Sequence, residues 1–118
     1  MNPKNDLLDL TFEFALEIIE YTEKIYSAKG FVISNQLLKS GTSIGANSRE
    51  AQSAESRTDF IHKLKIASKE CEETDYWLQL CKFSKSYPDP DNLIEKNLRI
   101  RNLLSKIIAT TRKRIKSK

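Results

Sequence analysis

Four carboxylates lie close together in the middle of the chain, at Glu70, Glu72, Glu73 and Asp75. Paired carboxylates perform general acid and base catalysis where burial separates their pKa values. The neighbouring sequence supplies no pocket for such a pair, and Lys69 precedes Glu73 by one helical turn, the spacing of an ion pair on a helix surface. We therefore interpret the cluster as a solvated or inter-subunit ion-pair face, and we predict no catalytic residue.

A metal site is the second chemistry that carboxylates allow. The di-metal sites of helical bundles take a Glu from each of two helices and a Glu-x-x-His from each of the other two. This chain has one histidine, His62, and Asp59 three residues before it gives the nearest approach to that motif. We interpret His62 as a surface residue and predict neither a metal nor another cofactor.

Cysteine chemistry has little support in the sequence. Cys71 and Cys81 lie ten residues apart, which is about 15 Å along a helix and too far for an intrachain disulfide. Both fall at core positions of a predicted helix, where free cysteine behaves as a small apolar residue. We expect a reduced, cytoplasmic protein with no enzymatic activity.

The strongest binding signal is the absence of acids from the C-terminal part of the chain. From Lys96 onward there are nine Lys or Arg and no Asp or Glu, whereas residues 1–95 carry 11 basic and 16 acidic residues. Basic side chains that neutralise phosphates release counterions and bind nucleic acid in a salt-sensitive way. The predicted nucleic-acid contacts are Arg99, Arg101, Lys106, Arg112, Lys113, Arg114 and Lys116, with Lys118 beyond them. No aromatic residue interleaves with them to stack single-stranded bases, and a solubilising helix face is the alternative.

Apolar spacing predicts the helices that position these residues. Steps of four and three residues form a heptad seam on a helix over about 57–85, and Ser56 with Asp59 resembles the capping box that opens it. The seam residues are Phe60, Leu64, Ala67, Cys71, Thr74, Leu78 and Cys81. The same kind of pattern predicts helices over about 5–29, 34–54 and 90–115.

Two glycines stand inside the second predicted helix. Gly41 and Gly45 are one turn apart, and each glycine in a helix interior costs about 1 kcal/mol relative to alanine. Close packing of another helix against this surface is the simplest compensation. Gly41 and Gly45 are therefore predicted helix-packing residues.

The whole chain, residues 1–118, fits one domain. Few glycines and prolines interrupt it, so the prediction is an all-α, antiparallel up-down-up-down four-helix bundle. No apolar run approaches the roughly 20 residues that span a bilayer, and no charged segment precedes an apolar one near residue 1, so we expect neither a membrane span nor a signal peptide. Tyr76 and Trp77 lie at the edge of the third helix, where an aromatic residue belongs either to the bundle core or to an oligomer contact, and aromatic residues are enriched at interface centres.

One segment resembles a known signature. Its most specific parts are Ser43-Ile44-Gly45-Ala46-Asn47, Glu50-Ala51, Asp59-Phe60 and Glu73-Thr74 with Trp77-Leu78. Together, residues 36–80 resemble the bacterial four-helix-bundle proteins named for the 23S ribosomal RNA intervening sequences. The resemblance implies an antiparallel bundle that assembles as a ring-shaped homopentamer and has no enzymatic activity.

The leading hypothesis is a cytoplasmic, non-enzymatic homopentamer that binds RNA through its basic C-terminal helix. The expectation of RNA rests on the family name and on the charge of the C-terminal helix. It does not rest on a matched binding motif, because the basic helix lies outside the matched signature. The alternative is a protein-interaction scaffold with no nucleic-acid role. In that case the basic helix pairs with the acidic first helix of the same or a neighbouring subunit. We expect no small-molecule substrate.

Overall fold

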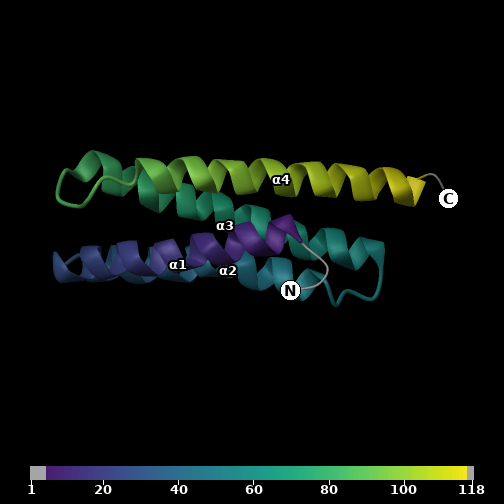
Figure 1. The fold of residues 1–118 in the computed structure, drawn as a ribbon, viewed down its shortest axis with the longest axis horizontal. Coiled ribbons are helices and arrows are strands. Elements are labelled where there is room, and N and C mark those ends of the chain that lie inside the picture. The colour runs from purple at the N-terminus through teal and green to yellow at the C-terminus, as the bar shows by residue number, and fades with distance from the viewer. Residues whose placement is uncertain (1–4, 117–118) are drawn as a thin grey trace.

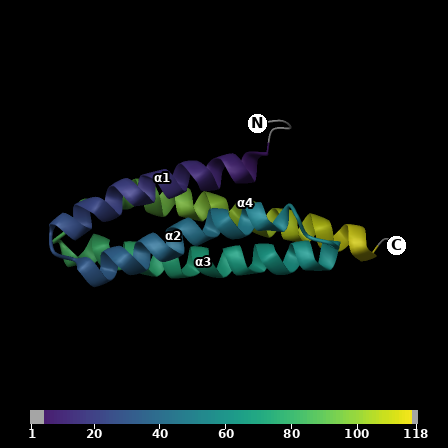
Figure 2. The same cartoon turned by 90° about the horizontal axis from the view of Figure 1, so that it is seen from below.

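Residues 5–116 of the computed structural model fold into four helices. These are α1 Asp6–Ser27, α2 Phe31–Ala51, α3 Arg57–Ser84 and α4 Asp91–Lys116. Helix α1 packs on α2 and α4, and α3 also packs on α2 and α4, so α1 and α3 lie on one diagonal of the bundle (Figures 1 and 2). The predicted all-α, antiparallel four-helix bundle is confirmed. None of the four helices has a stretch long and apolar enough to cross a membrane.

Side-chain caps explain where three of the helices begin. The Asn5 side-chain oxygen accepts a hydrogen bond from the Leu8 N–H at 3.1 Å, and Ser56 Oγ accepts one from the Asp59 N–H at 3.0 Å. Asp89 Oδ1 accepts a bond from the Asp91 N–H at 2.9 Å. Each cap satisfies an N–H group that has no partner within its own helix.

The turn between α1 and α2 differs from the sequence prediction. Lys29 takes the left-handed conformation, with φ of 68°, and this turn contains no left-handed glycine. Gly30 instead precedes α2, where a Cβ atom would lie 2.6 Å from the Tyr87 hydroxyl of the α3–α4 loop. Helix α2 consequently starts at Phe31 rather than Ser34, and it ends at Ala51 rather than 54. The Ser34 hydroxyl donates to the Thr22 carbonyl at 2.8 Å, so it ties α2 to α1.

The core follows the predicted seam of α3 with one change. Six seam residues are buried: Leu64, Ala67, Cys71, Thr74, Leu78 and Cys81. Phe60 is half-buried, and Ile61 takes the buried position in the first turn. In α4, Asn97 and Thr111 are buried beside Leu93, Ile100, Leu104 and Ile108, whereas Ile115 lies at the surface.

Buried polar contacts fix the axial register of the bundle. Thr74 Oγ1 donates to Ser40 Oγ at 3.0 Å, which aligns α3 with α2. Asn97 Nδ2 donates to the Cys71 carbonyl at 2.8 Å, which aligns α4 with α3. Such bonds favour one register because a shifted helix would leave the buried groups unpaired.

Helices α1 and α2 approach closely at the two glycines. A Cβ atom on Gly41 would lie 2.9 Å from two carbons of Ile18, and one on Gly45 would lie 3.3 Å from the Thr11 side chain. The contact between α1 and α4 is smaller, and Figure 2 shows the first turns of α1 diverging from the other helices. A groove of about 550 Å³ opens there, lined in part by Glu13, Arg99 and Leu103.

Candidate nucleic-acid interface

The basic residues of α4 lie outside its buried stripe. That stripe comprises Leu93, Asn97, Ile100, Leu104, Ile108 and Thr111. Lys106 and all five residues from Arg112 to Lys116 are exposed. Lys118 lies outside the described residues. The helix therefore presents most of its basic side chains to solvent, and their density is greatest in its last turns.

Ion pairs neutralise part of the first half of α4. Arg101 Nη2 lies 2.7 Å from Glu72 Oε1 on α3, and Lys96 Nζ lies 2.7 Å from Glu17 on α1. Arg99 borders the groove between α1 and α4 beside Glu13. Of the predicted contacts, Arg101 is thus paired with a carboxylate of the same chain, which reduces its attraction for phosphate, whereas Arg99 only shares a groove with Glu13.

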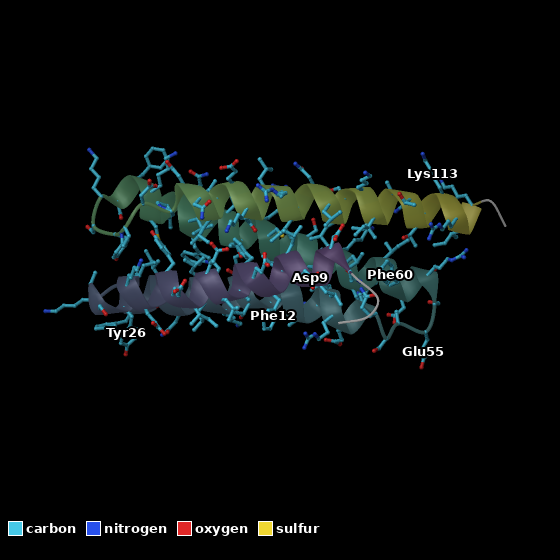
Figure 3. All side chains as sticks on the ribbon, in the orientation of Figure 1. Asp9, Phe12, Tyr26, Glu55, Phe60 and Lys113 are labelled. Atoms are coloured by element: carbon cyan, nitrogen blue, oxygen red, sulfur yellow. The ribbon has the colours of Figure 1, made fainter. Side chains whose placement is uncertain are left out.

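A further arginine joins the last turns of α4. Because α3 and α4 are antiparallel, α3 begins where α4 ends, and Arg57 Nη1 donates to the Arg114 carbonyl at 3.4 Å. We call the resulting surface the basic end. It comprises Arg57, Lys106, Arg112, Lys113, Arg114 and Lys116. Figure 3 shows Lys113 near the end of α4. Arg57 is absent from the contacts predicted from the sequence, although the predicted antiparallel order of the helices could have indicated it.

The basic end suits contact with phosphates better than contact with bases. Its six cations come from two helices, which meet where Arg57 contacts the Arg114 carbonyl, and α4 contributes no acid after Glu95. Phe60, the aromatic residue of the first turn of α3, is half-buried against the core. Without an exposed aromatic platform, single-stranded bases have nothing here on which to stack. A phosphate backbone remains the chemistry that this surface matches.

The acidic cluster of α3 does not converge on one site. Glu72 pairs with Arg101, and Asp75 accepts a hydrogen bond from Gln79 at 3.4 Å. Partial burial, followed by the charge of Glu73, raises the pKa of Glu70. These carboxylates therefore point to different partners. Within residues 5–116, no three His, Cys, Asp or Glu side chains are placed to hold a metal ion.

The two cysteines are buried as unpaired thiols. Burial raises the pKa of the Cys71 thiol to about 12, and it also raises the pKa of Cys81. A nucleophilic cysteine needs the opposite shift, toward the thiolate. His62, the remaining candidate for proton transfer, is exposed on α3.

The two aromatic residues predicted at an oligomer contact face different surroundings. Trp77 is half-buried and packs against the core. Tyr76 is 58% exposed, and its ring lies 5.3 Å from the Trp77 ring, centroid to centroid. Tyr76 is thus available to a partner, with Trp77 as its support.

Comparison with known proteins identifies similar chains. The family model described as 23S rRNA-intervening sequence protein matches residues 4–109. A crystal structure of a protein of unknown function from the S23 ribosomal protein family of Bacteroides thetaiotaomicron VPI-5482 is 42% identical, with a TM-score of 0.83. The alignment covers 86% of this chain and 97% of that chain. No curated protein matches the sequence.

Proposed function

The chain belongs to the 23S rRNA-intervening sequence protein family, and we propose that it is a non-enzymatic, cytosolic homo-oligomer that binds structured RNA. The observation that carries the RNA proposal is the basic end, where Arg57 of α3 meets the last turns of α4. The family name points to RNA, and the charge of this surface supplies a physical reason for it.

The absence of enzymatic activity is supported by the state of the candidate groups. The thiol of Cys71 is held protonated by burial, and the carboxylates of α3 are directed to separate partners. A groove of about 340 Å³ between α1 and α2 is lined by apolar and small side chains, with Arg49 at its edge. That lining brings no acid and base together. The buried, unpaired cysteines also fit a reducing compartment.

Salt dependence tests the RNA proposal directly. The assay is fluorescence anisotropy of a labelled RNA hairpin over a range of salt concentrations. A site that neutralises about six phosphates loses roughly a thousandfold in affinity between about 50 and 200 mM salt. Replacing Arg112, Lys113 and Arg114 with Glu removes three of the cations, so we expect weaker binding and a salt slope lower by about 3.

A matched variant separates this effect from net charge. Replacing Lys24, Lys29 and Lys39 with Glu makes the same charge change in the half of the bundle remote from the basic end. That variant should keep most of its affinity. No binding of the wild type at low salt, or equal losses in both variants, would count against the basic end and favour the scaffold alternative.

Exposed apolar side chains support the oligomer. Phe12 is 54% exposed and Phe83 is 72% exposed, and large apolar groups in solvent mark interaction surfaces when they cluster. We propose the homopentamer that the family resemblance implies. Light scattering coupled to size exclusion measures its mass, and a particle of 13.6 kDa at every concentration would be the single chain and would contradict it.

A further inference from the structure

Helix α1 carries a second apolar stripe that the other described helices leave largely exposed, although the Tyr26 ring packs edge-on against Phe31 of α2 at 4.7 Å between centroids. The stripe is formed by Phe12, Leu16, Ile19, Glu23 and Tyr26, at steps of four, three, four and three residues. Its four apolar members are between 39% and 54% exposed. Figure 3 shows Phe12 and Tyr26 on the side of α1 away from α4. Heptad spacing on an exposed helix face is the pattern by which one helix packs along another.

Helix α3 carries a stripe with the same spacing. It comprises Lys69, Glu73, Tyr76, Leu80 and Phe83, again at steps of four, three, four and three. Tyr76, Leu80 and Phe83 are among the exposed large apolar residues. Since α1 and α3 occupy one diagonal of the bundle, the two stripes lie on different faces of the molecule.

The two stripes also lie at matching heights along the bundle. Glu17 of α1 pairs with Lys96, and the next residue, Asn97, bonds to Cys71 of α3. A second set of contacts runs through α2. Thr11 of α1 lies beside Gly45 of α2. Ser40, five residues before Gly45, accepts a hydrogen bond from Thr74 of α3. These contacts put each α1 residue level with the α3 residue about 54 to 58 positions later. The stripes are offset by 57 positions, which falls inside that range.

Near the start of the two stripes, charges at the same heights are complementary. Asp9 and Glu13 flank the α1 stripe near its start, and Lys65 and Lys69 occupy the corresponding levels of α3. None of these four residues forms an ion pair with another described residue. Two parallel helices from different copies would bring Lys65 near Asp9 and Lys69 near Glu13, with Tyr76 against Ile19 and Phe83 against Tyr26.

We propose that the α3 stripe of one copy docks on the α1 stripe of the next, with the two helices parallel and level. This interface rests on the proposed homo-oligomer and specifies which surfaces form it. The contact is heterologous, because different patches of the two copies meet. Repeating it with a constant rotation about an axis along the helices closes a ring in which every copy points the same way.

Mixing two variants, each with one stripe disabled, tests whether the α1 and α3 stripes pair. Phe12→Glu with Leu16→Glu disables the α1 stripe, and Tyr76→Glu with Phe83→Glu disables the α3 stripe. These residues are exposed, so the helical fold should persist, which circular dichroism checks. Each variant alone should be a single chain of 13.6 kDa. An equimolar mixture should form a dimer and stop there, because one intact stripe of each kind remains available.

The outcomes separate this interface from the oligomer itself. A wild-type protein that stays a single chain would overturn both the oligomer and the interface. A wild-type oligomer whose variants still assemble alone, or whose mixture stays monomeric, would leave the oligomer standing and refute the pairing of these stripes. Should these variants unfold, exchanging the charges of Glu13 and Lys69 decides whether the two stripes pair.

Charge exchange tests the register of the same interface. Glu13→Lys or Lys69→Glu alone should raise the protein concentration at which the assembly dissociates by about tenfold. The double variant should recover most of that loss. Glu95→Lys changes the charge by the same amount on the outer face of α4 and should have little effect. Single and double variants that dissociate alike would refute the register.

Discussion

Replacing Gly41 with alanine tests how closely α2 lies against α1. The new Cβ atom would lie 2.9 Å from both Cγ1 and Cγ2 of Ile18, with Cδ1 at 3.2 Å. Ile18 is fully buried, so its side chain has no solvent-facing position to which it can move. At Gly45 the corresponding distances to Thr11 are 3.3 Å and 3.4 Å, which ask for a smaller displacement.

The net effect is a difference between two opposing terms. Alanine stabilises a helix interior by about 1 kcal/mol relative to glycine. Overpacking a well-filled core costs about 1–3 kcal/mol. The cost of the substitution at Gly41 should lie near the upper end of this range, because the new Cβ atom would meet two carbons of a buried residue. We therefore expect Gly41→Ala to lower the free energy of unfolding by about 1–2 kcal/mol. Gly45→Ala should stay within about 0.5 kcal/mol of the wild type.

Urea denaturation followed by circular dichroism measures this difference. All variants are compared at one protein concentration, because assembly contributes to stability. Combining Gly41→Ala with Ile18→Ala should yield a favourable coupling of about 1–2 kcal/mol, since removing both Cγ atoms makes room for the new methyl group. A Gly41→Ala variant as stable as the wild type, or a coupling near zero, would refute the close packing of α2 on α1.

Three further predictions concern the core, and one concerns RNA. Tyr21→Phe removes the hydrogen bond from the Tyr21 hydroxyl to the Pro88 carbonyl and should lower the unfolding free energy by about 1–2 kcal/mol, measured by urea denaturation. Glu17→Gln should cost about 0.5–1 kcal/mol at low salt and less at high salt, because it weakens the half-buried ion pair with Lys96. Stability should be independent of the Cys71 thiol below about pH 8.5, where the thiol is protonated in both states. Above that pH the unfolded chain releases the proton and the folded chain, with a Cys71 pKa of about 12, keeps it. Stability should thus fall by about 1.4 kcal/mol per pH unit from this thiol, and Cys71→Ala should flatten the profile of unfolding free energy against pH. Tyr76→Glu with Phe83→Glu should weaken RNA binding in the anisotropy assay although no basic residue changes, because a single chain lacks the multivalency of an assembly.

Much of the fold follows from local spacing. The seam of α3 predicts six of its buried positions because heptad steps keep one helix face in the core. It fails at the first turn, where Ile61 is buried and Phe60 lies at the margin. Near a helix end the neighbouring helices no longer surround the chain evenly, and the face that is covered depends on where those helices stop.

The site was less predictable than the fold for a definite reason. Charge alone put Arg101 among the nucleic-acid contacts, yet Arg101 lies 2.7 Å from Glu72. Which basic residue meets which acid depends on the axial register of α4 on α3, and the bond between Asn97 and Cys71 sets that register. A long-range contact of this kind leaves no periodic signal in the sequence. Arg57 was missed because its role depends on the end of a helix more than 50 residues later.

The division of charge along the chain is consistent with both proposals. Acids of α1 serve contacts with helices, since Glu17 pairs with Lys96 within the chain and Glu13 faces Lys69 in the proposed interface. The basic side chains of α4 are concentrated in the part of the helix after Glu95, where α4 carries no acid. Parallel docking would set the basic ends of all copies at the same end of a ring. An RNA that contacted two basic ends would bind more tightly, because the second contact is intramolecular and has a high effective concentration. Assembly through α1 and α3 would in this way strengthen RNA binding at the basic ends.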